Sequence, residues 1–127
     1  MVKISITHLG NAHSDWLRSL DFYKGEIRIL RNRLTEIAGK NTAPDILAKV
    51  EQFENQFNLQ TENIDRLTHD INHNLASISK EAQAQYAGYI DGILLALHNQ
   101  LSERFNEEEK VINELRHRFN DFAAAWM

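Results

Sequence analysis

Histidines and carboxylates are the side chains in this sequence best suited to chemistry, and six histidines occur among 127 residues. His69 and His73 lie four residues apart, a spacing that lets two imidazoles on one helix bind the same metal ion. Asp70 precedes His73 by three residues, and Glu114 and His117 repeat that spacing. Carboxylates and histidines at this spacing on two helices hold the metals of di-iron carboxylate bundles. A metal site built on His69, His73 and Asp70 is therefore one functional hypothesis.

The hydrophobic pattern argues against that hypothesis. Apolar residues recur every three or four positions along a line that we call the seam, and metal ligands would have to point inward along it. The seam passes through Ile71 and Leu115, which places the candidate histidines on the flanks, and the first predicted helix has no carboxylate on its seam. We therefore predict no metal and no other cofactor, and keep a metal-binding bundle (a sensor or an oxidase-like protein) as the alternative function.

Other kinds of catalysis and of binding find little support. The chain has no cysteine, no Gly-x-Ser-x-Gly elbow and no glycine-rich phosphate loop, since Gly88 and Gly92 fall inside a predicted helix. With 14 basic and 18 acidic residues the net charge is −4, whereas nucleic-acid-binding proteins are usually basic. The sequence therefore predicts a protein that is not an enzyme, with no catalytic residue and no nucleic-acid partner.

The sequence also predicts where the protein resides. Its first eight residues have no continuous apolar run of the kind found in signal peptides. The longest strongly apolar stretch, residues 93–97, is too short to span a bilayer. A cytoplasmic location without a membrane span is the expectation.

Composition and periodicity predict an all-α fold. Only one proline and five glycines occur, and helix-forming residues dominate. We predict a three-helix antiparallel bundle with coiled-coil-like packing and an overlong C-terminal helix. A single domain of residues 13–127 would contain helices at about 14–38, 43–75 and 79–126. Residues 1–12 would form an arm, because Val2, Ile4 and Ile6 alternate with polar residues.

Each predicted helix has a seam in which apolar residues follow one another in steps of mostly four and three. In the first helix the seam is Trp16, Leu20, Tyr23, Ile27, Leu30, Leu34 and Ile37. In the second it is Ile46, Val50, Phe53, Phe57, Gln60, Ile64, Leu67, Ile71 and Asn74 or Leu75. In the third it is Tyr86, Tyr89 or Ile90, Ile93, Leu97, Leu101, Phe105, Glu108, Ile112, Leu115, Phe119, Phe122 and Trp126.

The sequence signals for helix ends are clear between the first and second predicted helices and weaker between the second and third. Gly39 is expected to end the first helix in a left-handed conformation, and Thr42 with Pro44 to begin the second. Residues 75–80 hold only serine caps, so the turn placed there could instead be continuous helix. A break at 98–102 would give four helices in place of three.

Three polar residues fall on or beside the seam: Gln60, Asn74 and Glu108. A functional interpretation makes Glu108 a buried acid or a metal ligand. The interpretation that we favour is a polar layer that fixes the register of the helices, as a lone asparagine does in coiled coils.

The third helix is the predicted interface. At about 1.5 Å per residue, its last dozen residues would project beyond the 39–44 connection. That overhang carries Leu115, Phe119, Phe122 and Trp126, which a symmetric dimer would cover.

The beginning of the third helix points to the same surface. Gly88, Gly92 and Ala96 lie four residues apart and form a face almost without side chains, which suits close approach of another helix. The alternative is that this face packs only within one chain.

We therefore predict a non-catalytic interaction or scaffold protein that forms a homodimer through its third helix and binds a further, unknown protein. A third possibility is an anionic or membrane-surface partner for the basic residues Lys24, Arg28 and Arg31. Acidic residues on the second helix explain that stripe more simply, with Arg31 expected to face Glu51.

Overall fold

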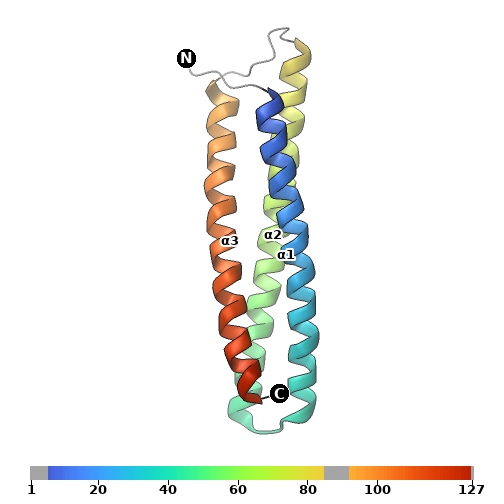
Figure 1. Cartoon of the computed structure of the whole chain (residues 1–127), viewed down its shortest axis with the longest axis vertical. Coiled ribbons are helices and arrows are strands. Elements are labelled where there is room, and N and C mark those ends of the chain that lie inside the picture. Colours follow the sequence, from blue (N-terminus) through green and yellow to red (C-terminus); the bar gives the residue numbers. More distant parts are fainter. Residues whose placement is uncertain (1–5, 85–91, 127) are drawn as a thin grey trace.

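Three long helices make up the protein. The computed structural model describes residues 6–84 and 92–126, and within these ranges it contains α1 (Ile6–Lys40), α2 (Pro44–Ala84) and α3 (Gly92–Trp126) and no strand. Figure 1 shows α1 and α3 running in the same direction and α2 running between them in the opposite direction. The predicted three-helix antiparallel bundle is confirmed.

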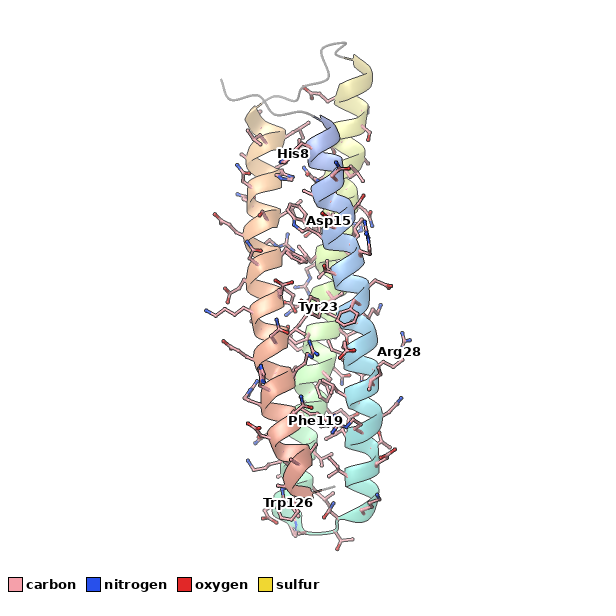
Figure 2. The ribbon with its side chains drawn as sticks, in the orientation of Figure 1. His8, Asp15, Tyr23, Arg28, Phe119 and Trp126 are labelled. Atoms are coloured by element: carbon pink, nitrogen blue, oxygen red, sulfur yellow. The ribbon has the colours of Figure 1, made fainter. Side chains whose placement is uncertain are left out.

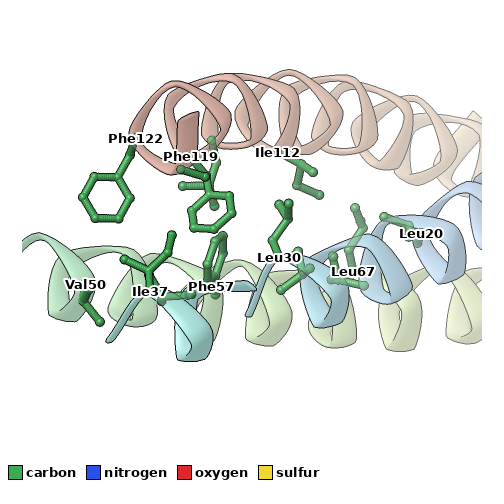
Figure 3. Packing of buried hydrophobic residues seen from close by; sticks show 14 of the residues in the cluster. Leu20, Leu30, Ile37, Val50, Phe57, Leu67, Ile112, Phe119 and Phe122 are labelled. Atoms are coloured by element: carbon green, nitrogen blue, oxygen red, sulfur yellow. The ribbon is translucent and has the colours of Figure 1, made fainter. Parts of the chain in front are cut away.

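The core follows one seam on each helix. Buried side chains recur in steps of four and three, so that each helix turns the same face inward along its whole length. Along α2 they are Ile46, Val50, Phe57, Gln60, Ile64, Leu67, Ile71, Asn74 and Ile78. Figure 3 shows part of this core from close by, with Phe57 of α2 packed against Phe119 of α3. Burial of the side chains on this repeat thus holds the three helices together.

The first helix begins earlier than predicted. Residues 6–12 were expected to lie in an extended arm, but they form the first turns of α1. The reason is visible in the seam, since Leu9 and His13 extend it backward from Trp16 in steps of four and three and both are fully buried. Residues 1–5 of the predicted arm lie outside the described residues.

The second helix continues through the predicted turn. Residues 75–80 are helical, and Ile78 is fully buried one seam position beyond Asn74. Ser77 does not cap a new helix there, because its hydroxyl donates to the carbonyl of His73 within α2 (3.1 Å). The prediction of a helix boundary at this point is therefore wrong.

The third helix is shorter than predicted within the described residues. It spans 35 residues against 41 in α2, and it continues without a break through 98–102. Arg33 of α1 donates to Asn120 of α3 (3.2 Å), so the last turns of α3 lie beside the last turns of α1. No overhang projects beyond the 41–43 connection.

The connection between α1 and α2 has only three residues, 41–43. Asn41 donates its amide hydrogen to the carbonyl of Ile37 (2.8 Å) and so satisfies an end group of α1. Gly39 is helical, in place of the left-handed residue predicted. The carbonyl of Ala43, one residue after the predicted cap Thr42, accepts the Leu47 N–H (3.1 Å) and begins α2.

The register of α1 against α2 differs from the charge-based prediction. Arg31 donates to Asn58 (2.6 Å), seven residues from the expected Glu51, and Lys24 pairs with Asp65 (2.6 Å). Exposed ion pairs contribute little free energy, so burial of the seam sets the register and the charges follow it. Two residues of the basic stripe are thereby occupied, while Arg28 points away from the bundle in Figure 2.

None of the described helices contains an apolar segment long enough to cross a membrane.

Gly25 is a position at which a substitution should make the protein more stable. It lies in the interior of α1, and a Cβ added there would meet no heavy atom within 4 Å. Gly25→Ala is therefore expected to raise the free energy of unfolding by about 1 kcal/mol, because alanine loses less backbone entropy in a helix. Urea unfolding measures the effect, with Gly39→Ala near the fraying helix end as a control of smaller effect. Lower stability of Gly25→Ala would contradict this expectation.

Candidate functional site

The structure does not bring together the residues of the alternative metal site. His69 and His73 are exposed, and their rings stack with centroids 6.5 Å apart. The Asp70 carboxylate instead accepts from Arg104 of α3 (2.8 Å). Across residues 6–84 and 92–126, no three metal-ligating side chains come together. The spacing along α2 is therefore not accompanied by a convergent set of ligands.

Three of the seven predicted interface residues belong to the core. Leu115, Phe119 and Phe122 are buried within one chain, and Phe119 packs edge to face on Phe53 and Phe57 at centroid distances of 5.4 Å. They were expected to project because the third helix was placed too far along the bundle. That expectation is wrong, since α1 and α2 cover them.

Trp126 and the small-residue face remain at the surface. Trp126 is 42% exposed at the end of α3. Gly92 and Ala96 are exposed, and nothing lies within 4 Å of a Cβ built on Gly92. No helix of the described chain therefore approaches Gly92 closely, and Gly88 lies outside the described residues.

An exposed apolar strip begins α3. Gly92, Ile93, Ala96 and Leu97 share one outer face, and Ile93 and Leu97 are 73% and 44% exposed. The predicted seam ran through Ile93 and Leu97, which is wrong. The buried positions are His98 and Leu101, which keep the four-and-three spacing, and this phase turns Ile93 and Leu97 outward. We call these four residues the α3 strip.

The most unusual feature of the core is a polar layer formed by one residue from each helix. His13 of α1, Asn74 of α2 and His98 of α3 are all at most 8% exposed. The two imidazole centroids are 5.0 Å apart, and His13 Nε2 lies 2.8 Å from the Asn74 amide oxygen. We call these three residues the histidine layer.

The hydrogen bonds of His13 define its proton positions. Nδ1 lies 2.6 Å from the carbonyl oxygen of Leu9, which can only accept, so Nδ1 carries a proton. A doubly protonated ring donates its second proton to Oδ1 of Asn74. A neutral ring instead accepts at Nε2 from the Asn74 amide nitrogen, once that amide has turned. The Asn74 side chain can therefore hydrogen-bond to His13 Nε2 whether that nitrogen donates or accepts.

His98 is less well satisfied than His13. Its Nδ1 is buried and has no hydrogen-bond partner in the part of the chain that the structure describes, and the same holds for Nδ2 of Asn74. Trp16 stacks beside His98, with centroids 4.9 Å apart, and contacts Phe105 on its other side. Burial, and then the nearby His13 and His8, lower the pKa of His98 from 6.5 to about 4. His98 is therefore neutral at pH 7.

The histidine layer divides the apolar core. On one side lies the main cluster, which reaches from Leu20 to Ala123. On the other lies a small cluster of Leu9 and Ile78, with Leu94 and Leu95 packed against it. Within the described part of the chain, few buried apolar side chains therefore lie beyond the layer.

A second polar group lies within the main cluster. Gln60 and Glu108 are buried on facing seams, and with its amide turned toward α3 Gln60 donates to both carboxylate oxygens of Glu108 (2.5 and 3.3 Å). Burial raises the pKa of Glu108. Beside it, Tyr23 donates to Glu109 (2.7 Å), and burial followed by this hydrogen bond raises the pKa of Tyr23. The predicted burial of Gln60 and Glu108 is confirmed.

Sequence reasoning missed His13 and His98. Both occupy seam positions, but the predicted seam of the first helix began only at Trp16, and that of the third helix passed through Leu97 in place of His98. Counting back from Trp16 by three leads to His13, and counting back from Leu101 by three leads to His98. A fixed seven-residue repeat is the signal that could have found both.

The buried carboxyl of Glu108 predicts how the stability of the protein changes with pH. Because folding raises the pKa of Glu108, the folded chain binds this proton more tightly, and its contribution to stability falls as pH rises from about 4.5 through the folded pKa. Glu108→Gln removes the buried charge and keeps an amide partner for Gln60. We expect it to raise the free energy of unfolding at pH 7 by about 1 kcal/mol and to have little effect at pH 4.

Urea unfolding at the two pH values measures this effect. Glu107→Gln, on the exposed neighbour of Glu108, is the matched control and should change stability by less than about 0.5 kcal/mol. A Glu108→Gln chain that is less stable than the wild type at pH 7 would show that the ionised carboxylate stabilises the fold.

Comparison with known proteins adds no function to this geometry. No protein family, no curated protein and no solved structure matches the chain. Its function must therefore be inferred from the surfaces and the polar layers described above.

Proposed function

We propose that this protein is a non-catalytic interaction module that pairs with a second copy of itself through the α3 strip. The observation that carries the proposal is the character of this segment. Gly92, Ile93, Ala96 and Leu97 are exposed on one face, and no charged residue occurs between residues 92 and 102. A contiguous apolar face without charges is typical of a contact surface.

A second copy is the partner that this surface fits best. In a two-fold symmetric contact each patch meets its own copy, so charged residues near the axis would face like charges. The α3 strip brings no such repulsion. Gly92 and Ala96 lie one turn apart and have almost no side chain, which allows the axes of two α3 helices to approach closely.

The size of the α3 strip also indicates how strong the pairing of two copies should be. Burying Ile93 and Leu97 of both copies would contribute several kcal/mol at about 25 cal/mol per Å². Loss of translational and rotational freedom offsets much of this gain. Pairing should therefore depend on concentration, and the single chain should remain folded, because its core is complete without a partner.

The proposal revises the predicted interface. Leu115, Phe119 and Phe122 take no part, since they pack inside one chain. Gly92 and Ala96 remain in it and are joined by Ile93 and Leu97. A cytoplasmic location and a further protein partner are predictions that accompany this proposal.

Analytical ultracentrifugation over a concentration series tests the pairing. The wild type should approach twice its chain mass of 14.7 kDa, and Leu97→Glu should stay at the single-chain mass, because a glutamate on the strip would face its own copy. Phe22→Glu is the matched control, since Phe22 is an exposed apolar residue of α1 (56%). It should still pair. A wild type that is monomeric at all concentrations would overturn the proposal.

An introduced cysteine gives an independent test. The chain has no cysteine of its own, so a single thiol reports only on its own position. Ala96→Cys should form a cross-linked dimer under mild oxidation within minutes, because the two thiols would lie close to the symmetry axis. Ala48→Cys, on an exposed position of α2, should cross-link slowly. Equal rates for the two variants would contradict a specific contact at the strip.

A further inference from the structure

Among the described residues, the histidine layer lies near the end of the bundle that has fewer buried apolar side chains. Beyond it, the helices are joined by the small cluster around Leu9 and Ile78, whereas the main cluster contains most of the core. The end of the bundle consists of residues 8–16, 74–81 and 92–101. Whatever weakens the histidine layer should therefore loosen this end first.

We propose that the histidine layer is a pH-sensitive latch: protonation of His98 releases the end of the bundle, while the main core stays folded. The layer brings two imidazoles within 5.0 Å of each other between three helices, and among the described residues the group that bonds to either ring from another helix is a neutral amide, that of Asn74. The proposal goes beyond pairing through the α3 strip and does not require it.

A proton on His98 cannot be accommodated in the closed layer. A charged ring there would be buried beside a second imidazole, which is costly without a compensating anion. His98 also has an unsatisfied nitrogen, since its Nδ1 has no partner among the described residues. In an opened end, His98 would be hydrated and would take up a proton freely.

The charged groups that the structure describes around the layer do not supply that anion. On α1, His8 adds a further site for positive charge, and Asp15 is exposed near Arg18 (3.5 Å). On α2, Asp70 and His73 border the groove outside Asn74, together with Arg104 of α3. Asp70 is already paired with Arg104 (2.8 Å).

Glu81 of α2 stands one seven-residue repeat beyond Asn74, two turns away from the layer. It is therefore too far along the helix to neutralise a charged His98 ring.

The expected size of the effect follows from linkage. His98 has a pKa of about 4 in the closed end and an ordinary value of 6.5 when hydrated. Closure is therefore favoured fully above pH 6.5, and its advantage is lost as pH falls from 6.5 toward 4. The equilibrium for opening should increase about twentyfold between pH 7 and pH 5. Glu108 belongs to the main core and stays folded, so it does not oppose this change.

Amide hydrogen exchange of the full chain at pH 7 and pH 5, corrected for intrinsic exchange rates, tests the latch. Protection in residues 8–16, 74–81 and 94–101 should fall about twentyfold at pH 5, while that of residues 27–37 and 112–119 should stay the same. A uniform fall over all of these segments would mean global acid unfolding and would overturn the proposal, as would unchanged protection at the end.

Variants assign the effect to the layer. His98→Phe keeps a ring beside Trp16 and should abolish most of the pH dependence. Asn74→Asp places a carboxylate on His13 Nε2 and should keep the end closed at pH 5. His117→Phe, on an exposed position, is the control and should respond like the wild type. A twentyfold response that persists in both His98→Phe and Asn74→Asp would overturn the proposal.

The same experiment on Leu97→Glu separates the latch from the proposed pairing. This chain cannot pair through the strip, yet its end should still open at pH 5 with the same twentyfold change. Loss of the response in Leu97→Glu would show that pairing, and not the histidine layer, protects the end, and would overturn the latch. Failure of pairing with a preserved response would affect only the proposed function.

Discussion

Burial of one residue at every third or fourth position, on three helices at once, is the constraint on which this structure depends. Each helix is more than 30 residues long and has to keep the same face inward throughout, which a seven-residue repeat allows. Positions on the repeat are buried whatever residue occupies them. His13, Asn74, His98, Gln60 and Glu108 are inside for this reason, although each costs free energy that an apolar residue would not.

This constraint explains how much could be predicted from sequence. The helical class, the antiparallel order and the connection before Pro44 follow from periodicity and from turn chemistry. Helix ends could not be predicted as well, because residues 6–12 and 75–80 carry weak local signals and are helical only through tertiary burial. That misplacement propagated to Phe119, which appeared to overhang although the real α1 covers it.

The candidate site shows a related limit of sequence reasoning. Ile93 and Leu97 look like core residues because they are apolar, while His98 looks like a surface residue because it is polar. Their positions are reversed in the bundle, since the phase of the helix is fixed by its neighbours over many turns. The two features of functional interest, an apolar strip outside and a histidine inside, are thus consequences of one phase. Residue type alone does not indicate that phase, whereas the seven-residue repeat continued back from Leu101 does.

The three-residue connection at residues 41–43 has a consequence for how the chain reaches this state. Closing a loop this short costs little entropy. Contacts between α1 and α2 can therefore form first next to the connection and then progressively farther from it. In that order of events, the third helix would dock onto an existing hairpin of α1 and α2. The end of the bundle at residues 41–43 would then form first, and the end that contains the histidine layer would close last.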